Sequence, residues 1–440
     1  MRDAVNALSL LACLACVSSV LAFQLPQVAL PRRHSSSLLQ GSSRSTSTTN
    51  DSTSPCFLNW FDKELVQGLH QHMAVNEPNY IQERAFSCFQ ETTKDMIVVS
   101  QTGSGKTLTF LMPILQSLRA SPEAQAIVIA PSDLLLHQHR EAAFGLDPVA
   151  SKRISFVTQY DGQTGNQDST ARTPNNICVV AVDEVDKVFF QASAFDEETT
   201  LTATGEAILR DFLTTTKYVR LICTTAFLSR AHQNDLVEKH MMGAELIREH
   251  VKSAQTQVLV PTLRQKFKYF SGDRIEKLLQ VLVEAQDDEF LSQGSTMIFC
   301  GGAQHAREAF DRFKESDDKD NHQPYHHVEE DILLLHEELQ EKETLELLTK
   351  LSGGGGANPH TNSIVFCTDV AARGLHIPNV RHVILLTVPT TISSFVHQVG
   401  RTARRGESGI VTCLVSTASG DYQKYTNLHA LQGASTLEFK

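Results

Sequence analysis

The sequence predicts an α/β protein with two domains, each built on a parallel sheet that helices cover on both faces. Two observations predict this fold. Apolar runs too short to be helices alternate with amphipathic stretches across residues 55–440, which is the pattern of parallel strands joined by helical crossovers. The chain of 440 residues is also too long for one ordinary domain, and its 41% hydrophobic content is enough for full cores.

Charge and cysteine content narrow the class of protein. A formal net charge of −11 argues against an overall basic surface that wraps nucleic acid, although it leaves room for a local basic groove. The folded part contains no paired Cys-x-x-Cys motifs, and two of the nine cysteines, Cys13 and Cys16, lie near the N-terminus. We therefore expect reduced thiols rather than a disulfide or zinc framework.

The first 54 residues differ in composition from the rest. Residues 1–22 carry Arg2 and then an apolar run, as a signal peptide does, and residues 23–54 are rich in Ser and Thr with the single acid Asp51. The two segments together resemble the bipartite plastid presequence of algae with secondary plastids. A plain secretory signal with a disordered linker, or an address for another organelle, is the alternative. We expect no membrane span in the mature form.

A glycine-rich stretch, Ser100–Thr107, organises the first domain (residues 55–250). It follows a short apolar run at 95–100 and precedes an apolar stretch at 108–115, so it reads as a turn between a strand and a helix. Such a turn points backbone N–H groups at a phosphate. The expected phosphate ligands are Gln101, Thr102, Gly103, Ser104, Gly105 and Lys106, with the Thr107 hydroxyl on Mg²⁺.

An aromatic residue and a glutamine upstream of this loop suit a nucleobase. Phe57 opens the folded part, and Gln82 follows 25 residues later (82 − 57). A Gln amide can both donate to and accept from an adenine edge, and an aromatic face can stack on its ring.

Further strands are predicted at 126–130, 177–182 and 219–223. The second of these ends in Asp183 and Glu184, and carboxylates at the carboxyl end of a buried strand suit a metal–nucleotide site. Asp183 would hold Mg²⁺, and Glu184 would polarise the attacking water.

A second domain (residues 258–440) follows a short linker at about 250–260. It begins near Leu263, continues with an amphipathic helix around 278–283, and has strands at 295–300 and 364–367. Loops are expected at 316–331, which contains His322, and at the glycine run 352–359. We expect the first loop to be an insertion that is exposed to solvent.

In this order, the elements resemble the DEAD-box family of superfamily 2 RNA helicases. Phe57 and Gln82 match the adenine-sensing motif, Ser100–Thr107 match motif I, and Asp183–Asp186 match the motif that names the family, with Val185 for Ala. The resemblance implies two RecA-like domains that bind ATP and Mg²⁺.

The second domain extends the resemblance. Thr368–His376 resembles motif V, which implies that Thr368 contacts RNA phosphate and that Gly374 approaches the nucleotide. His397–Arg404 resembles motif VI, which implies that Arg401 and Arg404 act as arginine fingers across the cleft between the domains.

Several positions depart from the family pattern. An arginine that would contact nucleic-acid phosphate is Asp133, the first arginine of motif VI is Gln398, and the ribose-contacting acid of motif V is His376. Thr224-Thr225-Ala226 stands where the family has Ser-Ala-Thr, so that Thr224 keeps a hydroxyl and Ala226 loses one. The interval from Pro131 to Asp183 is also short, 52 residues (183 − 131). We therefore expect weakened RNA binding, whereas the predicted set of nucleotide-binding residues is nearly complete.

The favoured function is an ATP-dependent RNA helicase or RNA-stimulated ATPase that contacts the RNA backbone without reading sequence. The expected partners are RNA and ribonucleoprotein or ribosome-assembly factors, and the expected state is a monomer. The alternative is a degenerate helicase that serves as a nucleotide- or RNA-binding scaffold. An ATP-dependent DNA helicase is disfavoured by the pairing of Phe57 with Gln82.

Overall fold

A computed structural model describes two lobes, residues 56–248 and 262–431, with gaps. The described residues are 56–160, 176–191, 200–213, 219–241, 243–248, 262–319, 332–336, 338–339, 343–344, 346–347, 363–369, 377 and 379–431. The predicted leader (1–54), the linker at 250–260, Gly374, His376 and the two predicted loops lie wholly or largely outside these residues. Both lobes belong to one unit, Ser54–Lys440.

The first lobe is a six-stranded parallel sheet in the order β3-β2-β4-β5-β1-β6. Its strands are β1 (Met96–Val99), β2 (Gln125–Ile129), β3 (Ile154–Val157), β4 (Ile177–Asp183), β5 (Arg220–Thr225) and β6 (Glu245–Arg248). Its helices are η1 (Phe57–Asn59), α2 (Lys63–Met73), α3 (Tyr80–Glu91), α4 (Lys106–Ala120), α5 (Asp133–Leu146), η2 (Ala150–Arg153), α6 (Val185–Val188), α7 (Ala203–Ile208), η5 (Leu209–Leu213), α8 (Arg230–Asn234) and η6 (Asp235–His240).

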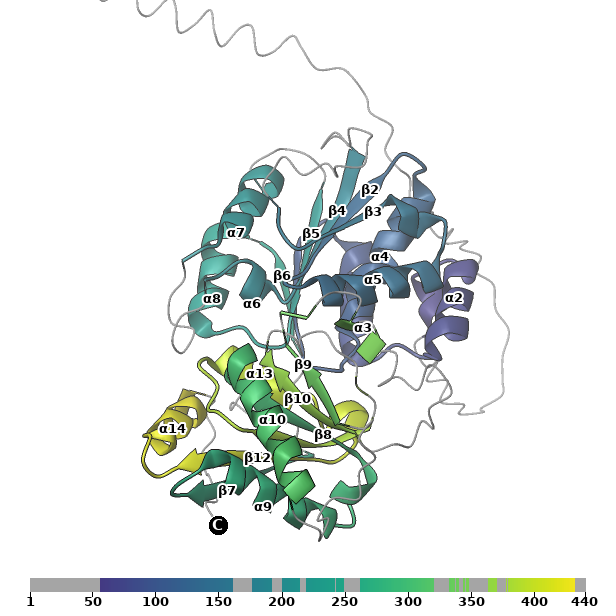
Figure 1. Cartoon of the computed structure of the whole chain (residues 1–440). Coiled ribbons are helices and arrows are strands. Elements are labelled where there is room, and N and C mark those ends of the chain that lie inside the picture. Colours follow the sequence, from purple (N-terminus) through teal and green to yellow (C-terminus); the bar gives the residue numbers. More distant parts are fainter. Residues whose placement is uncertain are drawn as a thin grey trace, which may run out of the picture. The chain divides into compact units, whose positions relative to one another are not determined.

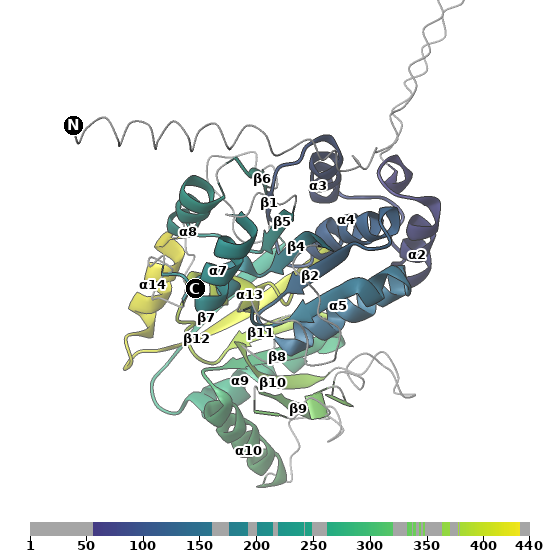
Figure 2. The same cartoon turned by 90° about the horizontal axis from the view of Figure 1, so that it is seen from above.

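Alternating side chains of the first sheet enter two separate cores. Val179 and Ala181 of β4 pack under α2, α3, α4 and α5, whereas Val180 and Val182 face α6, α7 and the turns η5 and η6. Figures 1 and 2 show these two helical layers on opposite sides of the sheet. Strands that are buried on both faces must be apolar throughout, which is why they read as unbroken apolar runs in the sequence.

The second lobe repeats this plan with the strand order β7-β12-β11-β8-β10-β9, all parallel. Its strands are β7 (Leu263–Phe270), β8 (Ser295–Cys300), β9 (Ile332–Leu335), β10 (Ile364–Thr368), β11 (Val380–Leu385) and β12 (Gly409–Ser416). Its helices are α9 (Arg274–Gln286), η7 (Leu291–Gln293), α10 (Ala303–Lys319), α13 (Ile392–Val399), η9 (Arg404–Gly406) and α14 (Asp421–Leu431).

The second sheet is likewise covered on both faces. Phe366 of β10 packs under α9 and α10, while its neighbours Val365 and Cys367 face α13 and α14. The predicted α/β class, with two parallel sheets covered on both faces, is therefore confirmed. The boundaries 55–250 and 258–440 stay predictions, since the residues between β6 and β7 are largely outside the described part.

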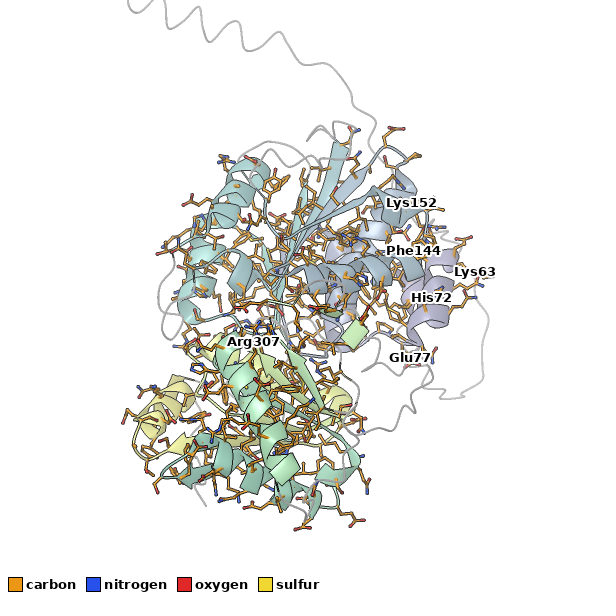
Figure 3. All side chains as sticks on the ribbon, in the orientation of Figure 1. Lys63, His72, Glu77, Phe144, Lys152 and Arg307 are labelled. Carbon is orange, nitrogen blue, oxygen red and sulfur yellow. The ribbon has the colours of Figure 1, made fainter. Side chains whose placement is uncertain are left out.

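Some large apolar side chains of the first lobe are exposed, among them Leu58, Phe144 and Val149. Figure 3 labels Lys63 and His72 on α2, Phe144 on α5 and Lys152 on η2. Every cysteine among the described residues is a free thiol. Within the same residues, we find no helix that combines the length and apolar character needed to cross a bilayer.

Candidate nucleotide-binding and hydrolysis site

The phosphate loop lies between β1 and α4, as the sequence predicts. Gly103 and Gly105 both have φ of 78°, a left-handed backbone that glycine adopts at little cost. Lys106 is the first residue of α4, and its Nζ donates to the carbonyls of Ser100 and Gln101 at 2.7 and 2.6 Å. The loop and the N-terminus of a 15-residue helix thus form an anion site.

The segment around Gln82 is tied directly to this loop. Asn79 caps α3 in a capping box with Gln82. The Asn79 amide then donates to the Ser104 carbonyl at 2.7 Å, and the Gln82 amide donates to the Gly105 carbonyl at 3.1 Å. Gln82 therefore holds the phosphate loop in place, in addition to facing the cavity beside it.

A cavity of about 610 Å³ opens between this segment and the loop. Its lining includes Tyr80, Gln82 and the loop residues Gln101–Gly105, and it also reaches Ala403 of the second lobe. A volume of this size is within the range that nucleotide-sized ligands occupy.

Phe57 does not line this cavity, so nucleobase binding by Phe57 stays a prediction. Phe57 is fully buried and packs against Phe86 of α3, with ring centroids 6.0 Å apart. Its ring is part of the apolar core that α3 covers. The aromatic residue that lines the cavity is Tyr80, which is 41% exposed. The sequence contained this signal, since Tyr80 stands two residues before Gln82.

Asp183 ends β4 at the carboxyl edge of the first sheet. Its Oδ1 accepts from the Thr224 hydroxyl at 2.5 Å and from the Glu184 backbone N–H at 3.0 Å, and its Oδ2 lies 3.0 Å from His139 Nε2. Burial raises the pKa of Asp183, but the contacts with His139, Thr224 and Lys106 outweigh it and leave the pKa below its usual value. Asp183 is therefore a buried carboxylate that stays charged.

Lys106 shares this environment. Burial lowers its pKa to about 8 against the opposing effect of Asp183 and Glu184, and the nearby Arg404 and Arg401 lower it further. The arginines predicted as fingers therefore lie within electrostatic range of the phosphate-loop lysine.

The residues present fit a magnesium–nucleotide complex. Thr107 and Asp183 supply hydroxyl and carboxylate oxygens, the ligands Mg²⁺ prefers, and Mg²⁺ is usually held by one or two such groups together with substrate phosphates. Among the described residues, no group of three or more His, Cys, Asp and Glu side chains is placed to hold a metal ion.

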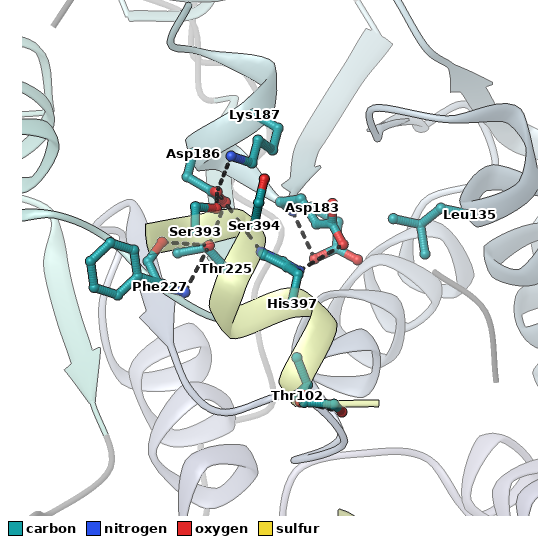
Figure 4. Close-up of polar contacts among 12 residues, drawn as sticks. Thr102, Leu135, Asp183, Asp186, Lys187, Thr225, Phe227, Ser393, Ser394 and His397 are labelled. Atoms are coloured by element: carbon teal, nitrogen blue, oxygen red, sulfur yellow. Dashed lines mark hydrogen bonds and ion pairs between the residues drawn. The ribbon is translucent and has the colours of Figure 1, made fainter. Parts of the chain in front are cut away.

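Asp186, the last residue of the acidic motif, is the centre of a second network (Figure 4). The Thr225 hydroxyl donates to its Oδ1, and the Ser393 hydroxyl, from α13 of the second lobe, donates to its Oδ2. His397 of the same helix lies 3.9 Å from Asp186 and 3.5 Å from Glu184. Burial lowers the pKa of His397 to about 4, so this imidazole is neutral at physiological pH.

The two threonines at the end of β5 serve different acids. The hydroxyl that contacts Asp186 comes from Thr225, and Thr224 serves Asp183 instead. The absence of a hydroxyl at Ala226 therefore leaves both acids with their threonine partners.

The carboxyl end of α13 meets the phosphate loop. The Thr102 hydroxyl donates to the Gly400 carbonyl at 2.8 Å, and a Cβ added at Gly400 would lie 2.1 Å from that hydroxyl oxygen. The Arg404 side chain passes beside Gly103, and its Nε donates to the Gly400 carbonyl at 2.9 Å. Arg401 is buried, with Nε donating to the His397 carbonyl at 3.2 Å. Lys106, Asp183, Glu184, Arg401 and Arg404 thus come together around one loop.

The positions at which the family resemblance implies RNA contacts are occupied or buried as follows. Asp133 is the first residue of α5, and its neighbour Leu134 packs with Phe227 against the apolar core of the second lobe. Gln398 is buried, and its Oε1 finds no hydrogen-bond partner among the described residues. Thr368, the predicted RNA contact, ends β10 with its side chain buried, so an RNA contact there stays a prediction.

Comparisons with known proteins agree with this geometry. Residues 79–234 match the DEAD/DEAH box helicase family, and residues 273–406 match the helicase conserved C-terminal domain. The chain belongs to the DEAD-box helicase family. The predicted family is thereby confirmed, and each lobe of this DEAD-box chain corresponds to one of the two matched domains.

Two curated relatives illustrate the extent of the match. DEAD-box ATP-dependent RNA helicase 39 of Arabidopsis thaliana is 27% identical over 390 residues, covering 80% of this chain and 57% of the plant protein. ATP-dependent RNA helicase RhlB of Sodalis glossinidius is 27% identical over 368 residues, covering 77% of this chain and 79% of the bacterial protein. The DEAD-box chain thus spans little more than half the length of the plant relative.

Among solved structures, S. cerevisiae Dbp5 bound to RNA and ADP BeF3 has a similar fold. The TM-score is 0.65 with 22% identity, and the match covers 87% of this chain and 95% of the yeast chain. The likeness establishes the fold of this DEAD-box chain as two RecA-like domains.

Proposed function

We propose that this DEAD-box protein is an RNA-stimulated ATPase that uses ATP and Mg²⁺ to remodel short RNA duplexes or RNA–protein complexes. One observation carries the proposal: the complete hydrolytic set surrounds a single phosphate loop. Lys106, Asp183 and Glu184 come from the first lobe, and the second lobe adds Arg401 and Arg404, whose charges lower the pKa of Lys106.

Each residue has a role that its position supports. Lys106 binds the β- and γ-phosphates, and Asp183 with Thr107 holds Mg²⁺. Glu184 orients the attacking water, and the arginines stabilise the charge that develops on the transferred phosphoryl group. Tyr80 and Gln82, which line the cavity, face the nucleobase. RNA contacts are to the backbone rather than to base edges.

Phosphate release with and without single-stranded RNA tests the proposal. Glu184→Gln is expected to lower kcat by about 10²–10⁴-fold, the usual contribution of a general base, while nucleotide binding persists. Glu91→Gln, at an exposed glutamate that ends α3, is the matched control and is expected to leave turnover unchanged. Nucleotide binding without RNA-stimulated turnover in the unaltered protein would refute the enzyme.

A second function, a nucleotide- or RNA-binding scaffold, is favoured by specific substitutions. Asp133 places a negative charge where phosphate contact would need a positive one, and buried Gln398 supplies no charge at all. A scaffold would bind ATP and RNA without hydrolysis, which the same phosphate-release assay detects.

We also propose a plastid address for this protein, supported by the signal-like residues 1–22 and the transit-like residues 23–54. A fluorescent protein fused after residue 54 is expected to accumulate in the plastid, and label in the medium would refute this address. We propose that the protein acts as a monomer on RNA and ribonucleoprotein or ribosome-assembly partners.

A further inference from the structure

His139 occupies an unexpected position in the first lobe. It is the seventh residue of α5, the helix that follows β2, and β2 is hydrogen-bonded to β4 in the sheet. Its imidazole is 2% exposed, and Nε2 lies 3.0 Å from Oδ2 of Asp183, the last residue of β4. A histidine inside the apolar layer beneath α5 is thus aimed at the acid that opens the family's acidic motif.

The chemistry of the pair fixes the direction of the hydrogen bond. An ionised carboxylate can only accept hydrogen bonds, so His139 Nε2 carries a hydrogen and donates the hydrogen bond to Asp183. The ring itself is held by Phe110 of α4, in an edge-to-face contact with centroids 5.2 Å apart and planes at 87°. The helix that begins with Lys106 therefore also holds the ring that orients Asp183.

The donors to Asp183 leave little freedom for a bound cation. A carboxylate has about four lone-pair sites, two on each oxygen. The Thr224 hydroxyl and the Glu184 N–H both donate to Oδ1, whereas His139 is the donor to Oδ2 among the residues that the structure describes. The remaining site lies on Oδ2, the same oxygen that His139 contacts, so His139 sets the direction in which that site points.

We propose that His139 is a positioning residue that holds the Asp183 carboxylate in the orientation in which it takes up the divalent cation of a Mg²⁺–nucleotide complex. The proposal deepens the function proposed above, since it concerns the same nucleotide site. It assigns a role to a residue on α5 that the sequence analysis did not single out.

The measurement is the Mg²⁺ dependence of nucleotide binding by the full chain. A fluorescent ADP analogue is titrated in EDTA and then at increasing Mg²⁺ concentrations, without any turnover. His139→Leu is expected to raise the Mg²⁺ concentration for half-maximal binding at least about 10-fold, the usual effect of removing a group that orients a metal ligand. Binding in EDTA is expected to stay unchanged, because the phosphate loop is intact.

Conservative variants separate positioning from packing. His139→Gln keeps an N–H donor and is expected to restore much of the wild-type Mg²⁺ dependence. If His139→Leu does not fold, His139→Phe supplies a ring without a donor and replaces it in the comparison. The control is His232→Leu, because His232 is equally buried and stacks on Phe190 at 4.0 Å without contacting Asp183.

Four results would overturn the proposal. The donor-less His139 variants could match the wild type in Mg²⁺ dependence, they could lose EDTA binding to the same degree, or His232→Leu could shift the Mg²⁺ dependence equally. A wild-type protein whose nucleotide binding ignores Mg²⁺ would also refute it. Because the readout is binding, absence of RNA-stimulated turnover would sink the proposed enzyme and leave this test intact.

Discussion

Thr225→Val is the most informative single substitution in the Asp186 network. Thr225 is fully buried at the end of β5, and its hydroxyl lies 2.5 Å from Asp186 Oδ1. Valine keeps the shape and removes the donor. A hydrogen bond to a charged group contributes about 1.5–3 kcal/mol, and Asp186 stays buried after the change. We therefore expect a loss of about 2–3 kcal/mol in the free energy of unfolding of the first lobe.

Thermal unfolding followed by circular dichroism measures this loss. A lobe of this size is expected to shift its Tm by about 2–4 °C for each kcal/mol, so Thr225→Val should lower Tm by about 4–12 °C. Thr225→Ser is the matched variant, because it keeps the hydroxyl and removes one methyl group, at a cost of about 1 kcal/mol. Equal Tm values for the Val and Ser variants would refute the assignment, since the hydroxyl would then contribute no more to stability than the methyl group does.

Two further predictions follow from backbone geometry and from charge. Ala74, exposed at the C-cap of α2, has φ of 50°, so Ala74→Gly should stabilise the protein by about 1 kcal/mol. The control Ala120→Gly, at the last residue of α4, should not stabilise it. A lower Tm for Ala74→Gly would contradict this prediction. The pKa of Lys106 is lowered to about 8 in the folded protein. Between about pH 8 and 10.5 the unfolded chain therefore binds more protons at this group than the folded chain does, so the contribution of Lys106 to the free energy of unfolding rises with pH across that window. Phosphate binds the protonated amine, so nucleotide affinity should fall as pH rises above about 8. Lys106→Met should abolish this pH dependence of affinity. A nucleotide affinity that stays independent of pH up to about 9.5 in the unaltered protein would contradict the prediction.

Residues next to the positions predicted to contact RNA take part in packing between the lobes. Leu134 and Phe227, both from the first lobe, pack against the second-lobe core, into which Ala226 is also built. Apolar side chains at Leu134, Ala226 and Phe227 stabilise the contact between the lobes because their burial removes apolar surface from water. Charged or hydroxyl-bearing side chains at these three positions would not gain this stabilisation. The phosphate-release assay decides between the proposed enzyme and the scaffold alternative.

Much of the fold and site follows from local pattern. A strand buried on both faces must be apolar throughout, so β4 and β10 are readable as runs without any knowledge of their neighbours. The phosphate loop is equally local, because Gly103 and Gly105 need left-handed backbone between a strand and a helix. The predicted positions of Lys106 and Asp183 rest on these two signals.

Other features depended on contacts between distant segments. Phe57 and Tyr80 are both aromatic and both precede Gln82, and only packing decides that Phe57 fills the core while Tyr80 lines the cavity. The threonines at the end of β5 alternate in direction, so the sheet register assigns Thr224 to Asp183 and Thr225 to Asp186.

The sequence by itself determined the fold class, the phosphate loop and the acids at the end of β4, because each depends on residues adjacent in the chain. The tertiary structure decided which side chains orient those acids. His139 reaches Asp183 from 44 residues away, and Ser393 reaches Asp186 from 207 residues away. No local pattern encodes such pairs, since a hydrogen bond depends on the distance between two atoms in the folded chain rather than on their separation in sequence.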